Sequence, residues 1–360
     1  MKMTFRWYGE ADDKVTLEQV AQIPGVSGVV GCLMDIPAGE VWPMDRVLAL
    51  KSQVEARGLE LEVIESVNVC DAIKAGTADR DRCIENYRQT IRNLGAAGVK
   101  VVCYNFMPVF DWVKSDLDYR LPDGSTTLAF RERDVPGNPQ DLLRRYQADA
   151  TYELPGWEPD RLARLEELFE LYGDVDEDAL RGNLVYFLEA IMPTCEEAGV
   201  TMAIHPDDPP YSVFGLPRIM STRDDLDWLC RAVPSPRNAI TLCCGSVAER
   251  PDNDLYAIIE EFASRGRIAF AHVRNVCYLP SGPRDFYECA HLSSEGSLDL
   301  WRIVRALHDN GFDGYIRPDH GRMIWGETGR PGYGLFDRAL GVTYINGLWE
   351  AVSKDGEARS

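Results

Sequence analysis

The chain has 360 residues, of which 45% are hydrophobic and 27% are charged, and its formal net charge is −20. This composition is typical of a globular protein with a full hydrophobic core. The negative charge argues against nucleic acid or an anionic membrane surface as a partner, because both are bound by basic patches.

The start of the chain and its cysteines indicate a compartment. The first nine residues contain no apolar segment of the kind that a secretory signal needs, and no run of residues reaches the length of a membrane span. The ten cysteines are scattered through apparent strands and helices. We therefore expect a cytoplasmic protein with free thiols and no membrane partner.

Eight short segments rich in apolar and β-branched residues predict buried strands. These segments are 4–8, 28–33, 59–64, 99–104, 201–205, 240–243, 268–272 and 315–318. Helical patterns lie between them at 45–57, 81–97, 183–198, 222–233, 253–264 and 297–310. The alternation predicts an α/β protein with a parallel sheet, and eight repeats favour a closed (β/α)8 TIM barrel.

Residues 106–180 interrupt this pattern after the fourth strand. The segment is too long for an ordinary loop between a strand and a helix, and 159–171 within it has a charged helical pattern. Because it leaves the carboxyl end of a strand, we expect it on the catalytic face. We interpret residues 1–360 as one barrel domain in which 106–180 is a lid or an oligomer contact, which makes a homo-oligomer plausible.

Four predicted strands end in residues that commonly bind metals: His205, Cys243, His272 and, directly after the last strand, Asp319. A lone histidine or cysteine is most often structural, but four strand ends of this kind are hard to explain by packing. Parallel barrel strands deliver their carboxyl ends to one face, so the four should converge. Two imidazoles, a thiolate and a carboxylate suit Mn²⁺ or Fe²⁺, although Zn²⁺ accepts the same ligand types.

Two residues beside this predicted metal site are candidates for proton transfer. His320 follows Asp319 directly, and both reach the site only if the chain turns after Pro318, which Gly321 favours. Tyr333 lies in a glycine-rich loop from which a phenol can approach the site.

Further residues at strand ends are candidates for substrate contact. Arg274 and Asn275 follow His272, and an arginine there would grip a carboxylate with two hydrogen bonds. The remaining candidates are Trp7, Tyr8, Asn105 and His291. The sequence does not separate the residues that contact substrate from those that only cap the barrel.

A metal, a carboxylate grip and an acid–base histidine point to a small polyhydroxylated acid as the substrate. Two reaction types fit these groups. One removes the proton next to the carboxylate and eliminates hydroxide; the other is an aldose–ketose isomerisation or an epimerisation. A metal would stabilise the negative charge in either reaction.

The chain resembles the mannonate dehydratases, the UxuA-type enzymes of hexuronate (glucuronate) catabolism, over nearly its whole length. The matching stretches are long and specific to that family. They are Phe5-Arg-Trp-Tyr-Gly9, Pro37-Ala-Gly-Glu-Val-Trp-Pro43, Glu65-Ser-Val-Asn-Val69, residues 101–112, His272-Val-Arg-Asn275, Gly314-Tyr-Ile-Arg-Pro-Asp-His-Gly-Arg322 and Arg330-Pro-Gly-Tyr-Gly334.

The resemblance implies a barrel of the xylose-isomerase-like kind and a metal-dependent hydro-lyase that converts D-mannonate to 2-dehydro-3-deoxy-D-gluconate and water. It also implies that one Mn²⁺ or Fe²⁺ is bound by the residues matching His205, Cys243, His272 and Asp319. The residues matching His320 and Tyr333 would then be the acid–base pair, and the sequence does not say which is which. Two positions, Cys70 and Cys244, depart from the family pattern without touching the predicted ligands.

Three other functions remain as alternatives. A sugar or sugar-acid isomerase or epimerase on the same barrel would release no water. A metal-dependent phosphodiesterase acting on nucleic acid is disfavoured by the net charge of −20. A binding protein without catalysis would have little need for His320 beside a full set of metal ligands.

Overall fold

Eight parallel strands form a closed barrel in the computed structural model, which describes residues 1–149 and 163–357. They are β1 (Lys2–Arg6), β2 (Gly28–Gly31), β3 (Glu60–Glu65), β4 (Val101–Tyr104), β7 (Thr201–Ile204), β8 (Asn238–Cys243), β9 (Ile268–Val273) and β12 (Tyr315–Pro318). Their order around the barrel is β1-β12-β9-β8-β7-β4-β3-β2, so each strand pairs with its neighbour in the barrel sequence and β12 closes onto β1. All eight predicted strands and the barrel are therefore confirmed.

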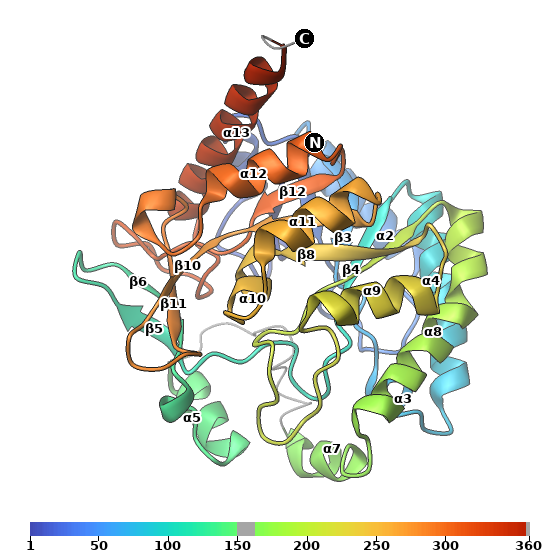
Figure 1. Cartoon of the computed structure of the whole chain (residues 1–360). Coiled ribbons are helices and arrows are strands. Elements are labelled where there is room, and N and C mark those ends of the chain that lie inside the picture. Colours follow the sequence, from blue (N-terminus) through green and yellow to red (C-terminus); the bar gives the residue numbers. More distant parts are fainter. Residues whose placement is uncertain (150–162, 358–360) are drawn as a thin grey trace.

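Helices surround the barrel, as the alternating pattern predicts (Figure 1). The helices that match predicted patterns are α2 (Met44–Glu55), α4 (Arg80–Ala96), α8 (Glu177–Ala198), α9 (Arg223–Ala232), α11 (Leu255–Ser264) and α12 (Leu300–Asp309). The additional ones are α1 (Leu17–Ala21), α3 (Asp71–Lys74), α5 (Pro139–Asp149), α7 (Leu165–Leu171), α10 (Cys244–Ala248) and α13 (Phe336–Glu357), with short 3-10 turns η1 (Glu132–Asp134) and η2 (Ser293–Glu295). Among the described helices, none combines the length and apolar character needed to cross a membrane.

Local sequence signals explain several helix ends. The side chain of Thr222 accepts a hydrogen bond from the backbone N–H of Asp225, and the Asp225 carboxylate accepts one from the backbone N–H of Thr222, so α9 begins with a capping box. Asp299 caps α12 in a similar way. Gly199 ends α8 with φ +70°, a left-handed conformation that favours glycine. These signals determine where α9 and α12 begin and where α8 ends.

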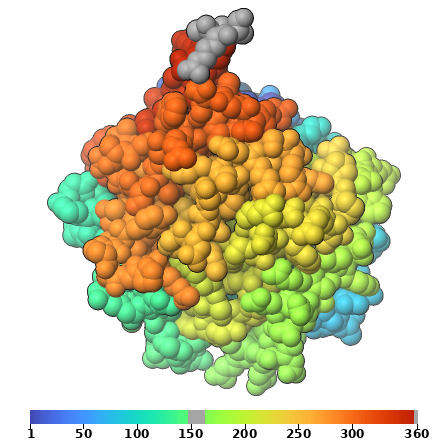
Figure 2. Space-filling view, in the orientation of Figure 1, coloured from blue at the N-terminus to red at the C-terminus, as the bar shows by residue number. Residues whose placement is uncertain are grey.

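The long helix α13 was not predicted from the sequence. Its buried residues Val342, Ile345 and Val352 pack in the main core, and the helix contacts α12 and β12. In the space-filling view, α13 extends from one edge of the molecule, and the adjoining elements pack closely over this face (Figure 2).

A second sheet lies outside the barrel and was also missed by the sequence analysis. It has four antiparallel strands in the order β10-β11-β6-β5. The strands β5 (Asp116–Arg120) and β6 (Thr126–Phe130) come from the predicted insertion, while β10 (Asn275–Tyr278) and β11 (Phe286–Cys289) follow β9. These strands lie together at the lower left of Figure 1. We call this sheet the cover sheet.

In its described residues, the insertion contains the strands β5 and β6 and the helices α5 and α7, of which α7 falls within the predicted helical pattern. Residues 150–162 lie outside the described part of the chain, so the predicted helix 159–171 can be compared only over its second half, where α7 spans Leu165–Leu171. The pairing of β6 with β11 joins the insertion to a segment that directly follows a barrel strand. This junction brings the cover sheet to the carboxyl ends of the barrel strands.

Candidate active site

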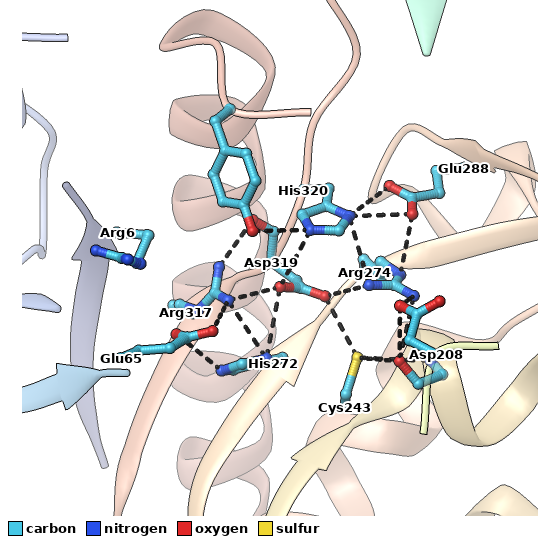
Figure 3. A network of polar contacts seen from close by, with 12 residues as sticks. Arg6, Glu65, Asp208, Cys243, His272, Arg274, Glu288, Arg317, Asp319 and His320 are labelled. Carbon is cyan, nitrogen blue, oxygen red and sulfur yellow. Dashed lines mark hydrogen bonds and ion pairs between the residues drawn. The ribbon is translucent and has the colours of Figure 1, made fainter. Parts of the chain in front are cut away.

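The four predicted metal ligands meet at the carboxyl ends of neighbouring barrel strands. Cys243 ends β8, His272 lies in β9, and His205 and Asp319 directly follow β7 and β12. Ligand atoms of His205, Cys243 and His272 all lie within 4.8 Å of one another. Asp319 adds a carboxylate whose Oδ2 is 3.3 Å from Cys243 Sγ and whose Oδ1 is 3.5 Å from His272 Nδ1. Figure 3 shows Asp319 between Cys243 and His272.

The chemistry of these four side chains fits a divalent metal. His272 is fully buried, and within the described residues its Nε2 makes no hydrogen bond, although Glu65 Oε2 lies 3.4 Å away. Burial lowers the pKa of His205, and burial together with Arg317 lowers the pKa of His272 to about 4. Both rings are thus neutral at physiological pH, which is the form that binds metals. His205 Nδ1 lies 2.7 Å from the carbonyl of Pro206, so its other nitrogen is left for a ligand.

Burial and nearby charges have opposite effects on the pKa values of the other two proposed ligands, Asp319 and Cys243. Burial would raise the pKa of the Asp319 carboxyl, but His320, Arg317 and Arg274 hold it well below its usual range. Burial raises the pKa of the Cys243 thiol well above its usual range. A cation bound here would displace the thiol proton, so metal binding at this site would release a proton.

A second possible ligand group shares His272. It combines His272 with Glu65 on β3 and Cys103 on β4. Glu65 Oε1 accepts a hydrogen bond from Arg317 Nη2 at 3.0 Å, and Glu65 Oε2 lies 3.4 Å from His272 Nε2. Glu65 begins one of the family-like stretches of the sequence, but the sequence analysis did not recognise Arg317, because an arginine inside a strand carries no signal of its role.

A cavity of about 60 Å³ opens beside the ligands. Its lining residues are Arg6, Tyr8, Met34, Glu65, Ser66, Asn68, Asn105, Asp111, Trp112, His205, Asp208, Arg274, Arg317, Asp319, His320 and Tyr333. A larger cavity of about 850 Å³ lies between the insertion and residues 323–331, and it has none of the predicted metal ligands in its lining. We take the smaller cavity as the candidate active site because ligands and proton-transfer groups meet there.

The pair of residues predicted for proton transfer is in hydrogen-bond contact. His320 Nε2 lies 3.0 Å from the Tyr333 hydroxyl, and His320 Nδ1 lies 2.8 Å from Glu288 Oε2. Both Asp319 and His320 reach the cavity, as a turn after Pro318 requires. A Cβ on Gly321 would lie 2.9 Å from the backbone nitrogen of Arg338, so the turn leaves no room for a side chain there.

Tyr333 is partly buried, and its surroundings favour the neutral phenol. Burial, with Tyr8 nearby, raises the pKa of Tyr333 well above its usual range. The Tyr8 ring meets the Tyr333 ring edge-on at 5.0 Å between centroids. Tyr8 in turn lies between two cations, with Arg6 3.9 Å and Arg330 4.1 Å from its ring centroid. Tyr333 is therefore held as a proton donor.

Arg274 lines the cavity, but its guanidinium is occupied by protein carboxylates. It lies 2.6 Å from Asp319 Oδ2, 2.7 Å from Glu249 Oε1 and 3.1 Å from Asp208 Oδ2. This arrangement differs from the expected free arginine fork for a substrate carboxylate. Because these bonds already engage its terminal nitrogens, Arg274 is placed to hold Asp319 and its neighbours in position.

A lysine of the insertion contacts two of the carboxylates that bind Arg274. Lys114 is fully buried, with Nζ 2.5 Å from Asp208 Oδ1 and 3.1 Å from Glu249 Oε1. Burial and the neighbouring Asp208 raise the pKa of Glu249 to about 7. Sequence analysis missed Lys114, Asp208 and Glu249, since none follows a motif and their partners lie far away in the chain.

Three residues predicted to contact substrate do not line the cavity. Trp7 Nε1 donates to the carbonyl of Val15, and the Asn275 amide bridges Leu292 and Leu298. His291 is buried against the backbone of Gly341, where a Cβ would lie 2.6 Å from the ring. We therefore leave these three out of the site. Tyr8, Asn105 and Arg274 do line it, whereas Cys70 and Cys244 do not.

The sequence was compared with known protein families. The model described as D-mannonate dehydratase (UxuA) matches residues 1–359. A mannonate dehydratase of Lactococcus lactis subsp. cremoris is 64% identical over 356 residues, which is 99% of each chain. One of Thermotoga petrophila is 58% identical over 98% of each chain.

Solved structures give the same picture. The mannonate dehydratase of Streptococcus suis serotype 2 superposes with a TM-score of 0.89 at 48% identity, covering 99% of this chain and 96% of that one. A xylose isomerase domain protein of Planctomyces limnophilus superposes with a TM-score of 0.57 at 12% identity, over 98% of each chain. The second similarity concerns the fold alone, and it confirms the expected xylose-isomerase-like barrel fold.

Proposed function

The chain belongs to the D-mannonate dehydratase family and catalyses the dehydration of mannonate, and we propose that His320 and Tyr333 carry out its proton transfers. The observation that carries this proposal is the hydrogen-bonded chain from Glu288 through His320 to Tyr333 at the edge of the cavity. Its members come from the cover sheet, the end of β12 and the glycine-rich loop.

The metal is proposed to be Mn²⁺ or Fe²⁺, held by His205, Cys243, His272 and Asp319. Support comes from the spacing of these ligand atoms and from the neutral state of both rings. His272 Nε2 also makes no hydrogen bond to any residue of the described ranges. When bound, such an ion supplies a Lewis acid that lowers the cost of negative charge next to the substrate carboxylate.

The geometry supports one division of roles between the two proton-transfer residues. A proton on His320 Nδ1 points to the Glu288 carboxylate, which leaves the Nε2 lone pair to accept a proton. Tyr333 is a neutral phenol and donates. We propose that His320 removes the proton from C2 and that Tyr333 protonates the C3 hydroxyl as it leaves. Proton transfer from His320 to Tyr333 then restores both groups.

The atoms balance in this scheme. The C2–H and C3–O bonds break, a C2–C3 double bond forms, and one water leaves. The resulting enol rearranges to a 2-keto-3-deoxy acid, so the product expected from D-mannonate is 2-dehydro-3-deoxy-D-gluconate. We propose that this reaction serves hexuronate catabolism.

The test of this proposal follows substrate and product directly. Metal is removed without oxygen, Mn²⁺ or Fe²⁺ is added back, D-mannonate is supplied, and the product is identified by NMR and mass. We expect the loss of one water and a 2-keto-3-deoxy acid only when metal is present. An unchanged mass with a new epimer or ketose would instead support an isomerase. Replacement of His320 by asparagine should lower kcat by roughly 10²- to 10⁴-fold, and unchanged turnover would remove it from the mechanism.

Three further expectations remain proposals. We propose that the insertion covers the active site. Its Lys114 contacts Asp208 in the site, and its strand β6 pairs with β11 in the cover sheet. A cytoplasmic location suits ten free cysteines, nine of them buried. Self-association is expected from the length of the insertion.

A further inference from the structure

Glu288 occupies an unusual place for a residue so close to the chemistry. It lies in β11 of the cover sheet rather than in the barrel, and it is 3% exposed. On the same strand, Phe286 lies with its ring 4.9 Å from Lys114 Nζ, whereas Tyr287 stacks on Tyr119 at 5.6 Å. Side chains alternate along a strand, so Phe286 and Glu288 share the face toward the active site and Tyr287 faces away.

The contacts of Glu288 converge on His320. Its two carboxylate oxygens lie 2.8 Å and 3.0 Å from His320 Nδ1. Burial would raise the pKa of Glu288, but His320 and Arg274 lower it, so the group is a carboxylate and can only accept hydrogen bonds. Figure 3 shows Glu288 pointing at the side of the His320 ring opposite Asp319.

One competing contact has to be weighed. Arg274 Nη1 also lies 3.4 Å from His320 Nδ1. A guanidinium only donates hydrogen bonds, so it would require a bare Nδ1. The carboxylate is closer by more than half an ångström on its nearer oxygen, and it requires a proton on Nδ1. The Glu288 contact therefore sets the tautomer.

We propose that Glu288 is a positioning residue for the dehydration: it fixes the proton of His320 on Nδ1 and turns Nε2 toward Tyr333 and the substrate. This inference rests on the proposed role of His320. It makes the cover sheet part of the catalytic machinery, because Glu288 lies in β11, where it pairs with Val276 of β10, and the neighbouring Phe286 and Tyr287 pair with β6 of the insertion.

The test is a double-mutant cycle measured on enzyme loaded with Mn²⁺, with kcat expressed per bound metal. We expect Glu288→Ala to lower kcat about 100-fold while KM and metal content stay as in the wild type. Glu288→Gln should recover about 10-fold of that loss, because its amide oxygen can accept the Nδ1 proton. In the His320→Asn background, Glu288→Ala should cause no further fall in kcat, because Glu288 acts only through the imidazole that this background lacks.

The matched control is Glu132→Gln, which removes a charge from the insertion at an exposed carboxylate paired with Arg284. It should leave kcat unchanged. Wild-type kcat in Glu288→Ala, or losses that multiply in the double variant, would overturn the inference. A fall in activity that only follows a fall in bound metal would overturn it as well. If Glu288→Ala does not fold, the isosteric Glu288→Gln is compared in both backgrounds instead.

Failure of this inference is distinguishable from failure of the proposed function. If the wild type forms no 2-keto-3-deoxy acid, or His320→Asn turns over like the wild type, the proposed function of His320 is wrong. If His320→Asn is slow while Glu288→Ala is fast, only the positioning role is wrong.

Discussion

The side chain of Arg274 packs directly against Gly245 and leaves no room for a Cβ atom at that position. A Cβ placed on Gly245 would lie 2.0 Å from Arg274 Nε and 2.6 Å from its Cζ. Gly245 lies in α10, which follows β8, and Arg274 directly follows β9. These two strands carry the proposed metal ligands Cys243 and His272. The glycine thus lets the guanidinium pass beneath α10 to reach Asp319 and Asp208.

Replacement of Gly245 by alanine should therefore impair the site. Arg274 would have to move, and Asp319, Asp208 and Glu249 would lose a buried cation. We expect a loss of about 3 kcal/mol in the free energy of unfolding, together with reduced metal content. Chemical denaturation and metal analysis measure the two effects.

The control is Gly182→Ala in α8, where a Cβ would meet no atom within 4 Å. Alanine favours a helix over glycine, so this variant should gain about 0.5–1 kcal/mol. Equal behaviour of the two alanine variants would contradict the steric argument for Gly245.

Cys243→Ser should remove the metal. A serine hydroxyl does not provide the thiolate that a soft or borderline metal prefers. We expect metal per chain to fall sharply and activity to fall with it, as measured by elemental analysis of protein reconstituted without oxygen. Cys277→Ser, at a half-buried cysteine of the cover sheet, should keep its metal. Full metal content in Cys243→Ser would exclude this cysteine as a ligand.

The proposed roles of His320 and Tyr333 predict different isotope behaviour. In D₂O, Tyr333→Phe keeps the base and loses the acid, so C2 of mannonate should exchange its proton while little water is eliminated. His320→Asn should lose both exchange and elimination. Proton NMR of recovered mannonate gives the readout. Exchange that survives in His320→Asn but not in Tyr333→Phe would reverse the assignment.

Glu249 predicts a dependence of stability on pH. Its folded pKa of about 7 lies above its ordinary value of 4.5, so the folded protein binds this proton more tightly than the unfolded chain. The stabilisation is fully present below about pH 4.5 and is lost as the pH rises through about 7. Relative to Glu249→Gln, the wild type should lose up to about 3 kcal/mol across this window.

Urea denaturation of both proteins with equal metal load, at several values between pH 5 and 8, measures this difference. Glu260→Gln, at an exposed carboxylate of α11, serves as the control and should show no trend across the same window. A constant difference between the wild type and Glu249→Gln would show that Glu249 keeps its ordinary pKa.

The barrel could be predicted, and the convergence of the proposed metal ligands with it, because the signals are local and repeated. Each strand is a short apolar run, and each proposed ligand stands at the end of one, so topology alone brings His205, Cys243, His272 and Asp319 together. His320 and Tyr333 followed from a turn after Pro318 and a glycine-rich loop, and they are in contact.

The missed features depend on contacts between distant parts of the chain. Strand β6 is recognised as a strand only when β11 lies beside it, and Lys114 gains its role only from Asp208 and Glu249. Arg274 was predicted to bind a substrate carboxylate, but its guanidinium contacts Glu249 and Asp319. A sequence does not reveal which carboxylates reach an arginine. Periodicity carries no information about such pairings.

The shared cover sheet also has a consequence for synthesis. Strand β6 leaves the ribosome well before β11. The edge of β6 that pairs with β11 therefore has no partner while the second half of the barrel is synthesised. Unpaired strand edges invite association with other chains. The barrel itself cannot close before β12 pairs with β1. The nascent enzyme therefore passes through a stage that exposes an open edge on both sheets, and chaperone contact at that stage would protect it.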